Sequence, residues 1–266
     1  MTRISERLAV LGSRNEHALI GYAVAGYPDR ESTLDVIKAM IKGGVDIVEL
    51  GIPFSDPIAD GSTIQKASYK ALQQGMTPRE ALQMAKQIND NLGVPLAIMT
   101  YYNILYKPGF DNFLRNARSS GVDGLIIPDL TFEEAGDLKK CASKHSLDTI
   151  FLVSPNISEQ RIKAIVNVTT GFLYMVSVFG TTGERNAFED YTVQAIRKVK
   201  KHSKPKVPLA VGFGVSKEEH VKFMLNAGAD AVIVGSAFIN IIEQNSRQEM
   251  TSKIESLARS LKNATC

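Results

Sequence analysis

The stretch VELGIPFSDPIADG, residues 48–61, places three acidic residues in and directly after a strongly apolar run. Glu49 lies inside that run, where an ionised carboxylate without a partner costs several kcal/mol. None of the eight apolar runs along the chain contains a lysine or arginine that could pair with it. Burial raises the pKa of a carboxyl group, which suits a group that both gives and takes a proton near neutral pH. Glu49 is therefore the first candidate for acid-base chemistry.

Asp56 and Asp60 follow in the next loop, where Asp-Pro and Asp-Gly are also ordinary turn sequences. Asp60 stands eleven residues after Glu49, in a loop that must fold back over the end of the strand that carries Glu49. This position favours Asp60 as a second acid of the same site, while the interpretation as a plain turn stays open.

Two glycine-containing segments have the pattern of a phosphate site. One apolar run ends AVGFGVS and the next ends IVGSAFI. Glycine lets backbone N–H groups approach an anion, and the first turn of a helix adds favourable dipoles. Tight turns also use glycine, so only the pair of motifs together indicates a phosphorylated small molecule. A third segment, FGTTGERNAF (179–188), is interpreted as a lid over the site, with a plain surface loop as the alternative.

Eight short β-rich runs position these residues, and segments with helical periodicity lie between them. In residues 158–171, for example, Ile162, Ile165 and Val166 recur at helical spacing. Near-continuous apolar strands are typical of a parallel sheet that is buried on both faces. The eight runs cover residues 19–26, 46–53, 95–103, 124–130, 149–155, 172–179, 208–214 and 231–237.

This pattern predicts an α/β fold, a single (β/α)8 TIM barrel over residues 1–266. A doubly wound open sheet is the alternative, but it would use fewer strands and a glycine-rich first turn, which AVAGYPDR does not provide. Segment 1–14 is predicted to be an extra N-terminal helix that closes the bottom of the barrel. The long stretch 54–94 is a candidate functional insertion.

The barrel predicts where Glu49 points. Side chains alternate along a strand, so if Val48 and Leu50 pack outward against helices, then Ile47 and Glu49 point into the barrel. Glu49 then lies near the C-terminal mouth, the end at which barrel enzymes place their active sites.

Composition excludes several classes of function. Hydrophobic residues make up 44% and charged residues 22% of the chain, and its formal charge of +3 is too small and scattered for a nucleic-acid footprint. The apolar runs are far shorter than the roughly 20 residues that span a membrane, and the N-terminus lacks the apolar core of a signal peptide. We therefore expect a cytoplasmic protein. The two cysteines and four isolated histidines imply no metal site.

The motifs resemble those of the tryptophan synthase alpha subunit family over about residues 1–245. VELGIPFSDPIADG is long enough to be highly specific, and GYAVAGYP, TYYN, GVDGLIIPDL, FLYMVSVFGTTG, AVGFG and IVGSA follow the family's order. The resemblance implies a (β/α)8 barrel that cleaves indole-3-glycerol phosphate to indole and glyceraldehyde 3-phosphate without a cofactor. It also implies a partner, the pyridoxal phosphate-dependent beta subunit, in an alpha2beta2 heterotetramer.

The resemblance assigns roles to individual residues. Glu49 would be the acid/base, and Asp60 would hydrogen-bond the indole N–H and stabilise the cationic intermediate. The remaining residues would contact the substrate (Tyr22, Ile64, Met99, Tyr101, Tyr174 and Thr182), bind its phosphate (Gly183, Gly214, Gly235 and Ser236) or face the beta subunit (Pro53, Asp56 and Asp129).

Some positions depart from the common family pattern. Ser62 and Thr131 stand where proline is usual, and Tyr22 stands where phenylalanine is often found. None of these changes removes an acid or a phosphate glycine.

Three other functions stay open at this point. The chain could be a stand-alone lyase of the same family that releases free indole. It could be a non-catalytic subunit that only activates a beta partner, although an idle site has no reason to keep a buried acid. A third reading is another phosphate-binding barrel, such as a sugar-phosphate isomerase, which would not need two acids at this spacing.

Overall fold

The computed structural model describes residues 1–176, 185–203, 205–212 and 214–266, without the side chains of 185–189. The described residues contain nine strands in one sheet, in the order β5-β4-β3-β2-β1-β9-β8-β7-β6, and every pairing is parallel. Their bounds are β1 (Ala18–Val24), β2 (Ile47–Gly51), β3 (Leu96–Met99), β4 (Gly124–Ile126), β5 (Asp148–Ile150), β6 (Leu152–Val153), β7 (Leu173–Val176), β8 (Leu209–Gly212) and β9 (Ala231–Val234).

The sheet closes into a barrel at the predicted strand 149–155, which covers β6 and most of β5. Its two ends, β5 and β6, are separated along the chain by Phe151 alone. The N–H of Tyr174 donates to the carbonyl of Phe151 at 3.0 Å, so hydrogen bonding to β7 continues across this interruption. The predicted strand 149–155 is therefore present as two halves of one barrel strand. The barrel prediction is confirmed, and the open doubly wound sheet is wrong.

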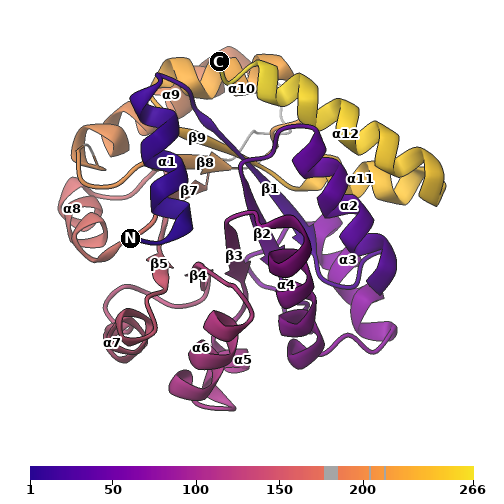
Figure 1. Cartoon of the computed structure of the whole chain (residues 1–266). Helices are drawn as coiled ribbons and strands as arrows, with labels where there is room; N and C mark the ends of the chain where they lie inside the picture. The colour runs from indigo at the N-terminus through magenta and orange to yellow at the C-terminus, as the bar shows by residue number, and fades with distance from the viewer. Residues whose placement is uncertain (177–184, 204, 213) are drawn as a thin grey trace.

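Helices surround the strands on the outside of the barrel (Figure 1). They are α1 (Arg3–Ser13), α2 (Arg30–Lys42), α3 (Ser62–Gln73), α4 (Pro78–Leu92), α5 (Tyr102–Tyr106), α6 (Phe110–Ser119), α7 (Gly136–Lys144), α8 (Glu159–Val168), α9 (Arg185–Ser203), α10 (Glu218–Ala227), α11 (Ser236–Gln244) and α12 (Arg247–Asn263). The helix predicted from the periodicity of 158–171 is α8, and its buried residues are Ile162, Ile165 and Val166.

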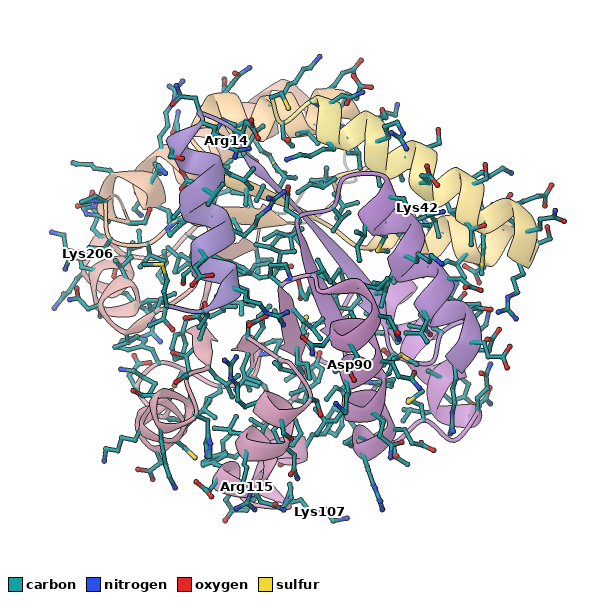
Figure 2. The ribbon with its side chains drawn as sticks, in the orientation of Figure 1. Arg14, Lys42, Asp90, Lys107, Arg115 and Lys206 are labelled. Carbon is teal, nitrogen blue, oxygen red and sulfur yellow. The ribbon has the colours of Figure 1, made fainter. Side chains whose placement is uncertain are left out.

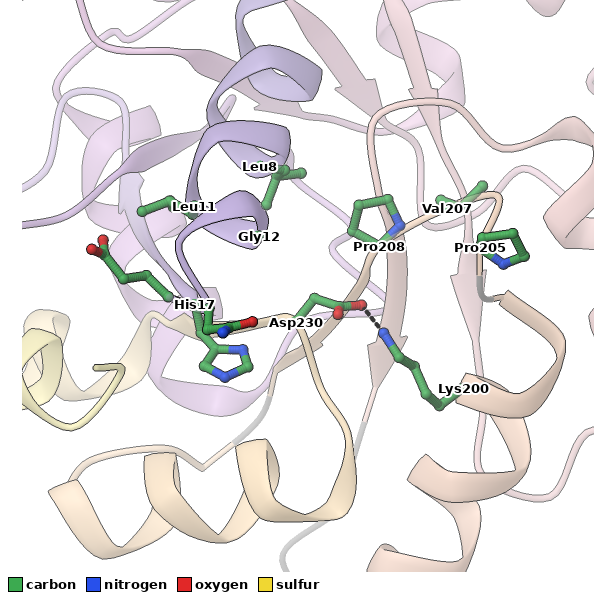
Figure 3. A pocket seen from close by; sticks show the side chains of 11 residues that line it. Leu8, Leu11, Gly12, His17, Lys200, Pro205, Val207, Pro208 and Asp230 are labelled. Atoms are coloured by element: carbon green, nitrogen blue, oxygen red, sulfur yellow. Dashed lines mark hydrogen bonds and ion pairs between the residues drawn. The ribbon is translucent and has the colours of Figure 1, made fainter.

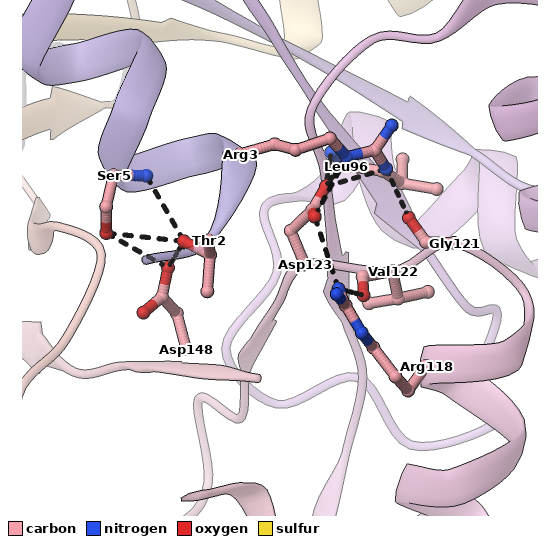
Figure 4. A network of polar contacts seen from close by, with 9 residues as sticks. All are labelled: Thr2, Arg3, Ser5, Leu96, Arg118, Gly121, Val122, Asp123 and Asp148. Atoms are coloured by element: carbon pink, nitrogen blue, oxygen red, sulfur yellow. Dashed lines mark hydrogen bonds and ion pairs between the residues drawn. The ribbon is translucent and has the colours of Figure 1, made fainter. Parts of the chain in front are cut away.

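The N-terminal helix α1 lies across one end of the barrel, as predicted (Figure 1). Its apolar side chains Ile4, Leu8 and Leu11 belong to the same buried cluster as Ala18 and Ile47 at the starts of β1 and β2. Polar residues at the start of the helix also contact this end. Arg3 pairs with the buried Asp123, directly before β4, and Thr2 hydrogen-bonds to Asp148, the first residue of β5 (Figure 4). The helix thus closes the N-terminal end of the barrel.

Strand β2 alternates between two cores. Ile47 packs in the cluster inside the barrel, whereas Val48 and Leu50 pack in the outer cluster between strands and helices. This alternation confirms the predicted orientation and places the side chain of Glu49 inside the barrel. The assignment of residues 1–266 to a single domain stays a prediction.

The structure corrects several predicted boundaries. The run 95–103 is a strand only as far as Met99, and helix α5 begins at Tyr102. The run 231–237 likewise ends as a strand at Val234, and α11 begins at Ser236. Residues 100–103 and 235–237 contain no proline or charged residue that would mark the end of a strand, so composition alone does not show where the ladder stops. The candidate insertion 54–94 contains the Asp60 loop followed by α3 and α4.

Charged side chains are spread over the periphery. The labelled residues Arg14, Lys42, Asp90, Arg115 and Lys206 come from different elements and are all exposed (Figure 2). This distribution agrees with the scattered charge expected from the sequence. Within the described part of the chain, no helix combines the length and the apolar character needed to cross a membrane.

Candidate active site

A cavity of about 240 Å³ opens at the C-terminal ends of the strands. Nine residues predicted to form the site line this one cavity, although they are spread over more than two hundred positions of the sequence. They are Tyr22, Glu49, Asp60, Ile64, Met99, Tyr174, Gly214, Gly235 and Ser236. This is the end of the barrel at which active sites of the fold lie.

Glu49 is fully buried at the base of this cavity. In the sheet it stands between Tyr22 of β1 and Ala97 of β3. Neither of its carboxyl oxygens has a hydrogen-bond partner among the described residues. Burial raises the pKa of Glu49 to about 8, and the nearby Asp60 adds to the rise. At neutral pH the group is therefore mostly protonated and can act as an acid.

Asp60 lies in the loop between β2 and α3, just before Gly61 caps that helix. Its carbonyl accepts a hydrogen bond from Gln65 at 2.8 Å, which ties the loop to the first turn of α3. Desolvation raises the pKa of Asp60 to about 6, and a hydrogen bond with Tyr101 opposes the rise. The two acids therefore have different environments, and at pH 7 Asp60 is mostly ionised while Glu49 is mostly neutral.

Two buried tyrosines form the walls between the acids and the glycine-rich end. Tyr22 packs against Gly51, where an added Cβ would collide with its hydroxyl, and against Gly235, where a Cβ would lie 3.2 Å from its ring. Tyr174 packs against Gly212, where a Cβ would lie 3.0 Å from its hydroxyl. Burial raises the pKa of both tyrosines well above the usual value, so both stay neutral phenols.

Three of the four predicted phosphate residues, Gly214, Gly235 and Ser236, line the same cavity. Gly214 has φ of +69°, a left-handed conformation that favours glycine. Gly235 is the N-cap of α11, and Ser236 is the first residue of that helix. The N–H groups of a first helical turn lack partners within the helix and point along its axis. This corner can therefore receive an anion.

The other predicted residues have different places. Tyr101 is buried but does not line the cavity as the described residues define it. Of the positions predicted to face a partner, Pro53 is buried, while Asp56 and Asp129 are exposed. Thr182 and Gly183 lie outside the described residues, so their predicted roles stay predictions.

Several residues that line the cavity were not predicted from the sequence. Ser216 and Asn240 add polar groups near the glycine-rich corner. Asn240 lies one helical turn after Ser236 on α11, and this i, i+4 spacing is the signal that could have identified it. The others are Ala59, Gly61, Leu152, Val176, Val215, Ile233 and Ala237. Three of them, Leu152, Val176 and Ile233, are apolar strand residues that nothing in the sequence distinguishes from core residues.

A second cavity of about 410 Å³ lies at the opposite end, beside α1 (Figure 3). Leu8 and Leu11 line it together with Pro208 and the ion pair between Lys200 and Asp230. The Asp230 carboxylate also accepts the N–H of Leu209, the first residue of β8, so its hydrogen bonds stabilise the barrel. The Asp230 carboxylate of this cavity is therefore committed to the fold, and Glu16, which also lines it, is half-buried.

Asp111, Cys141 and His145 form a cluster whose candidate ligand atoms lie within 4.8 Å of one another. Cys141 on α7 and His145 at its C-terminal end share a face because they are four positions apart. Lys144 already donates to the Asp111 carboxylate at 2.8 Å. Because this carboxylate has a cation beside it, the cluster does not indicate a metal site.

Comparisons with known proteins agree with this arrangement. A family model described as tryptophan synthase alpha chain matches residues 8–266. The tryptophan synthase alpha chain of Methanosarcina mazei is 45% identical over 260 residues, which cover 98% of this chain and 93% of the relative. That of Methanothermobacter thermautotrophicus is 43% identical over 249 residues, 93% and 92% of the two chains.

Solved structures give the same result. Tryptophan synthase subunit alpha from Legionella pneumophila superposes with a TM-score of 0.90 at 34% identity, over 100% of this chain and 98% of that chain. A chain of tryptophan synthase from M. tuberculosis superposes with a TM-score of 0.88 at 31% identity, over 100% of both chains.

Proposed function

Because the chain belongs to the tryptophan synthase alpha chain family, it is an indole-3-glycerol phosphate lyase, and we propose that Glu49 and Asp60 carry its acid-base chemistry. The observation that carries this proposal is the fully buried Glu49, which has no hydrogen-bond partner among the described residues and faces the cavity. A buried carboxyl group without a partner destabilises the fold, so a purely structural role does not account for it.

Glu49 can serve both proton transfers of a retro-aldol cleavage. With its pKa raised to about 8, it begins mostly protonated and donates its proton to the indole ring carbon that carries the glycerol side chain. As a carboxylate it then takes the proton of the adjacent hydroxyl. The carbon-carbon bond breaks, its electrons return to the indole ring, and the hydroxyl carbon becomes the aldehyde. Glu49 is protonated again, so the cycle balances without a cofactor.

Asp60 complements this step because its charge has the opposite sign to the intermediate. Protonation of the ring carbon makes the indole nitrogen cationic, and an ionised carboxylate that accepts its N–H stabilises that charge. The contact strengthens as the charge develops, which is the condition for accelerating the reaction. At the far side of the cavity, Gly214, Gly235 and the start of α11 would hold the phosphate.

The partner of the chain is a tryptophan synthase beta subunit, and indole is the product that it receives. We propose an alpha2beta2 assembly in which Pro53 and the exposed Asp56 and Asp129 face that subunit. The biosynthetic role of the family supports a cytoplasmic location, which cell fractionation would test.

The pH dependence of indole release tests the assignment of the two acids. Because Asp60 must be ionised and Glu49 protonated, kcat/KM should be bell-shaped, with limbs near the two pKa values of about 6 and 8. Indole and glyceraldehyde 3-phosphate should form in equal amounts, with and without a beta subunit. A rate that is flat between pH 5 and 9, within about twofold, would contradict the assignment.

The same assay addresses the alternatives. A non-catalytic activating subunit would release no indole, and the orientation of Glu49 into the cavity argues against it. A stand-alone lyase would be fully active and insensitive to a beta subunit. None of the comparisons favours either alternative.

A further inference from the structure

Tyr101 contacts the Asp60 loop near both ends of that loop. It lies two residues after the end of β3 and is only 3% exposed. Its ring stacks on Phe54, with ring centroids 5.0 Å apart and an angle of 23° between the planes. Its hydroxyl oxygen accepts the backbone N–H of Ala59 at 3.1 Å. Phe54 lies near the start of the loop between β2 and α3, and Ala59 lies directly before Asp60.

The same hydroxyl group also reaches the acid itself. A phenol has one proton to donate and lone pairs to accept with, so it can serve two neighbours at once. While its oxygen accepts from Ala59, its proton can serve the Asp60 side chain next to Ala59, and this interaction lowers the pKa of Asp60 against the effect of burial. A hydrogen bond donated to a carboxylate favours its ionised form, and this is the form that can stabilise a cation.

Tyr101 is in turn anchored from the next strand end. The carboxylate of Asp129, which follows β4, accepts the N–H of Tyr102 at 2.9 and 3.2 Å. This contact holds the first turn of α5, for which Tyr101 is the N-cap residue. The ends of β2, β3 and β4 are thereby linked through one tyrosine.

We propose that Tyr101 is a positioning residue that holds Asp60 in its working orientation, and not a wall of the substrate cavity. The proposal rests on the proposed function, because it takes Asp60 as the second acid. The cavity supports it, since its described lining includes Ala59, Asp60 and Gly61 but not Tyr101. The side chain therefore lies behind the loop and acts on the substrate only through that loop.

The test is the Tyr101→Phe variant of the full chain, assayed with indole-3-glycerol phosphate. It keeps the stacked ring and removes the hydroxyl, so we expect kcat to fall roughly tenfold and KM to change less than about threefold. The acid limb of kcat/KM should move to higher pH, because the contact that favours the ionised form of Asp60 is lost. Tyr69→Phe on α3, at a side chain that is 63% exposed, is the matched control and should leave both unchanged.

The pH shift needs assignment to one group. Glu49, Tyr22 and Tyr174 also lie within electrostatic reach of Asp60. We therefore repeat the substitution in an Asp60→Asn background, where Tyr101→Phe should cost less than about twofold because its target is already lost. A tenfold cost in that background as well, or an acid limb that does not move, would overturn the proposal.

Two further variants separate this proposal from the proposed function. Phe54→Leu keeps the hydroxyl and removes its stacked support, so kcat should fall in the same direction, again only when Asp60 is present. If Asp60→Asn keeps wild-type activity, the assignment of Asp60 fails and this proposal fails with it. If Asp60→Asn is impaired but both Tyr101→Phe and Phe54→Leu match the wild type, only the positioning role is overturned.

Discussion

At the N-terminal end of the barrel, three buried or half-buried aspartates stand directly before strands, and each has a full set of partners. Asp46 accepts the N–H of Leu19 and pairs with Arg7 and Lys262. Asp123 and Asp230 make the same kinds of contact. Each accepts an N–H at the start of the neighbouring strand and pairs with at least one cationic side chain. Figure 4 shows Asp123 between Arg3 and Arg118.

At the C-terminal end the opposite arrangement holds. Glu49 is as deeply buried as Asp123, at 0% exposure, yet no described residue hydrogen-bonds to its carboxyl oxygens. Both carboxyl groups lie in the same fold, so burial alone does not separate them. The difference is in the neighbours: paired acids stabilise the barrel, whereas an unpaired acid with a raised pKa remains available for proton transfer.

The largest expected effect is the loss of activity on replacing the unpaired acid. Glu49→Gln should lower kcat by roughly 10²–10⁴-fold, because a positioned acid/base contributes about that factor. Asp46→Asn, at the other end, should change kcat of the folded protein less than about threefold, since it is remote from the cavity. Steady-state indole release measures both. Activity of Glu49→Gln within tenfold of wild type would remove the distinction between the two ends.

The second effect is the pH dependence of stability. Glu49 has a folded-state pKa of about 8 against an ordinary value of 4.5. Its contribution is fully present below about pH 4.5 and is lost as pH rises to about 8, because the unfolded chain ionises first. The loss is at most on the order of 5 kcal/mol.

Urea unfolding of the wild type and Glu49→Gln from pH 5 to pH 9 measures this loss. The variant has no carboxyl group to ionise at this position, so its free energy of unfolding should decline less over this range. Parallel curves for the two proteins would show that the folded-state pKa of Glu49 is not raised.

The third effect is a loss of stability without a loss of activity. Asp123→Ala should lower the free energy of unfolding by about 2–3 kcal/mol, less than for a fully buried pair because Arg3 and Arg118 are partly exposed. It leaves the N–H of Leu96 without its acceptor. Chemical denaturation measures the loss, and kcat of the folded fraction should stay unchanged. A destabilisation below about 0.5 kcal/mol would mean that the paired acids do not hold this end together.

The smallest effect concerns the phosphate corner. Gly235→Val should weaken binding of glyceraldehyde 3-phosphate by roughly tenfold, because the new side chain meets Tyr22 and obstructs the backbone at the start of α11. Gly214→Val should act in the same direction through its positive φ. The control is Gly12→Ala in α1, where an added Cβ has no atom within 4 Å. Unchanged affinity by calorimetric titration in both valine variants would place the phosphate elsewhere.

Much of the site could be predicted because its residues lie at strand ends that the apolar runs mark. The barrel and the inward side chain of Glu49 follow from alternating patterns that the structure retains, and the closing helix α1 is the leading segment that falls outside the repeat. Boundaries were less predictable. Thr100 still donates its N–H to the carbonyl of Ile126 in β4, whereas Tyr102 and Asn103, which end the same predicted run, already belong to α5.

Tyr101 shows why some roles could not be predicted. Its sequence position, beside residues that line the cavity, is compatible with a substrate contact. Whether its ring turns toward the cavity or behind the Asp60 loop depends on Phe54 and Ala59, which come from another strand end. Contacts between distant segments leave no local pattern in the sequence.

The sequence by itself therefore determined which residues are available for chemistry, because a carboxyl group inside an apolar strand is unusual wherever that strand lies. It also determined the barrel, because strand and helix periodicities are local properties. Only the tertiary structure decided which buried acids are paired. The partners of Asp46, Asp123 and Asp230 come from helices, whereas no described side chain pairs with Glu49, and a carboxyl pKa depends on this three-dimensional neighbourhood.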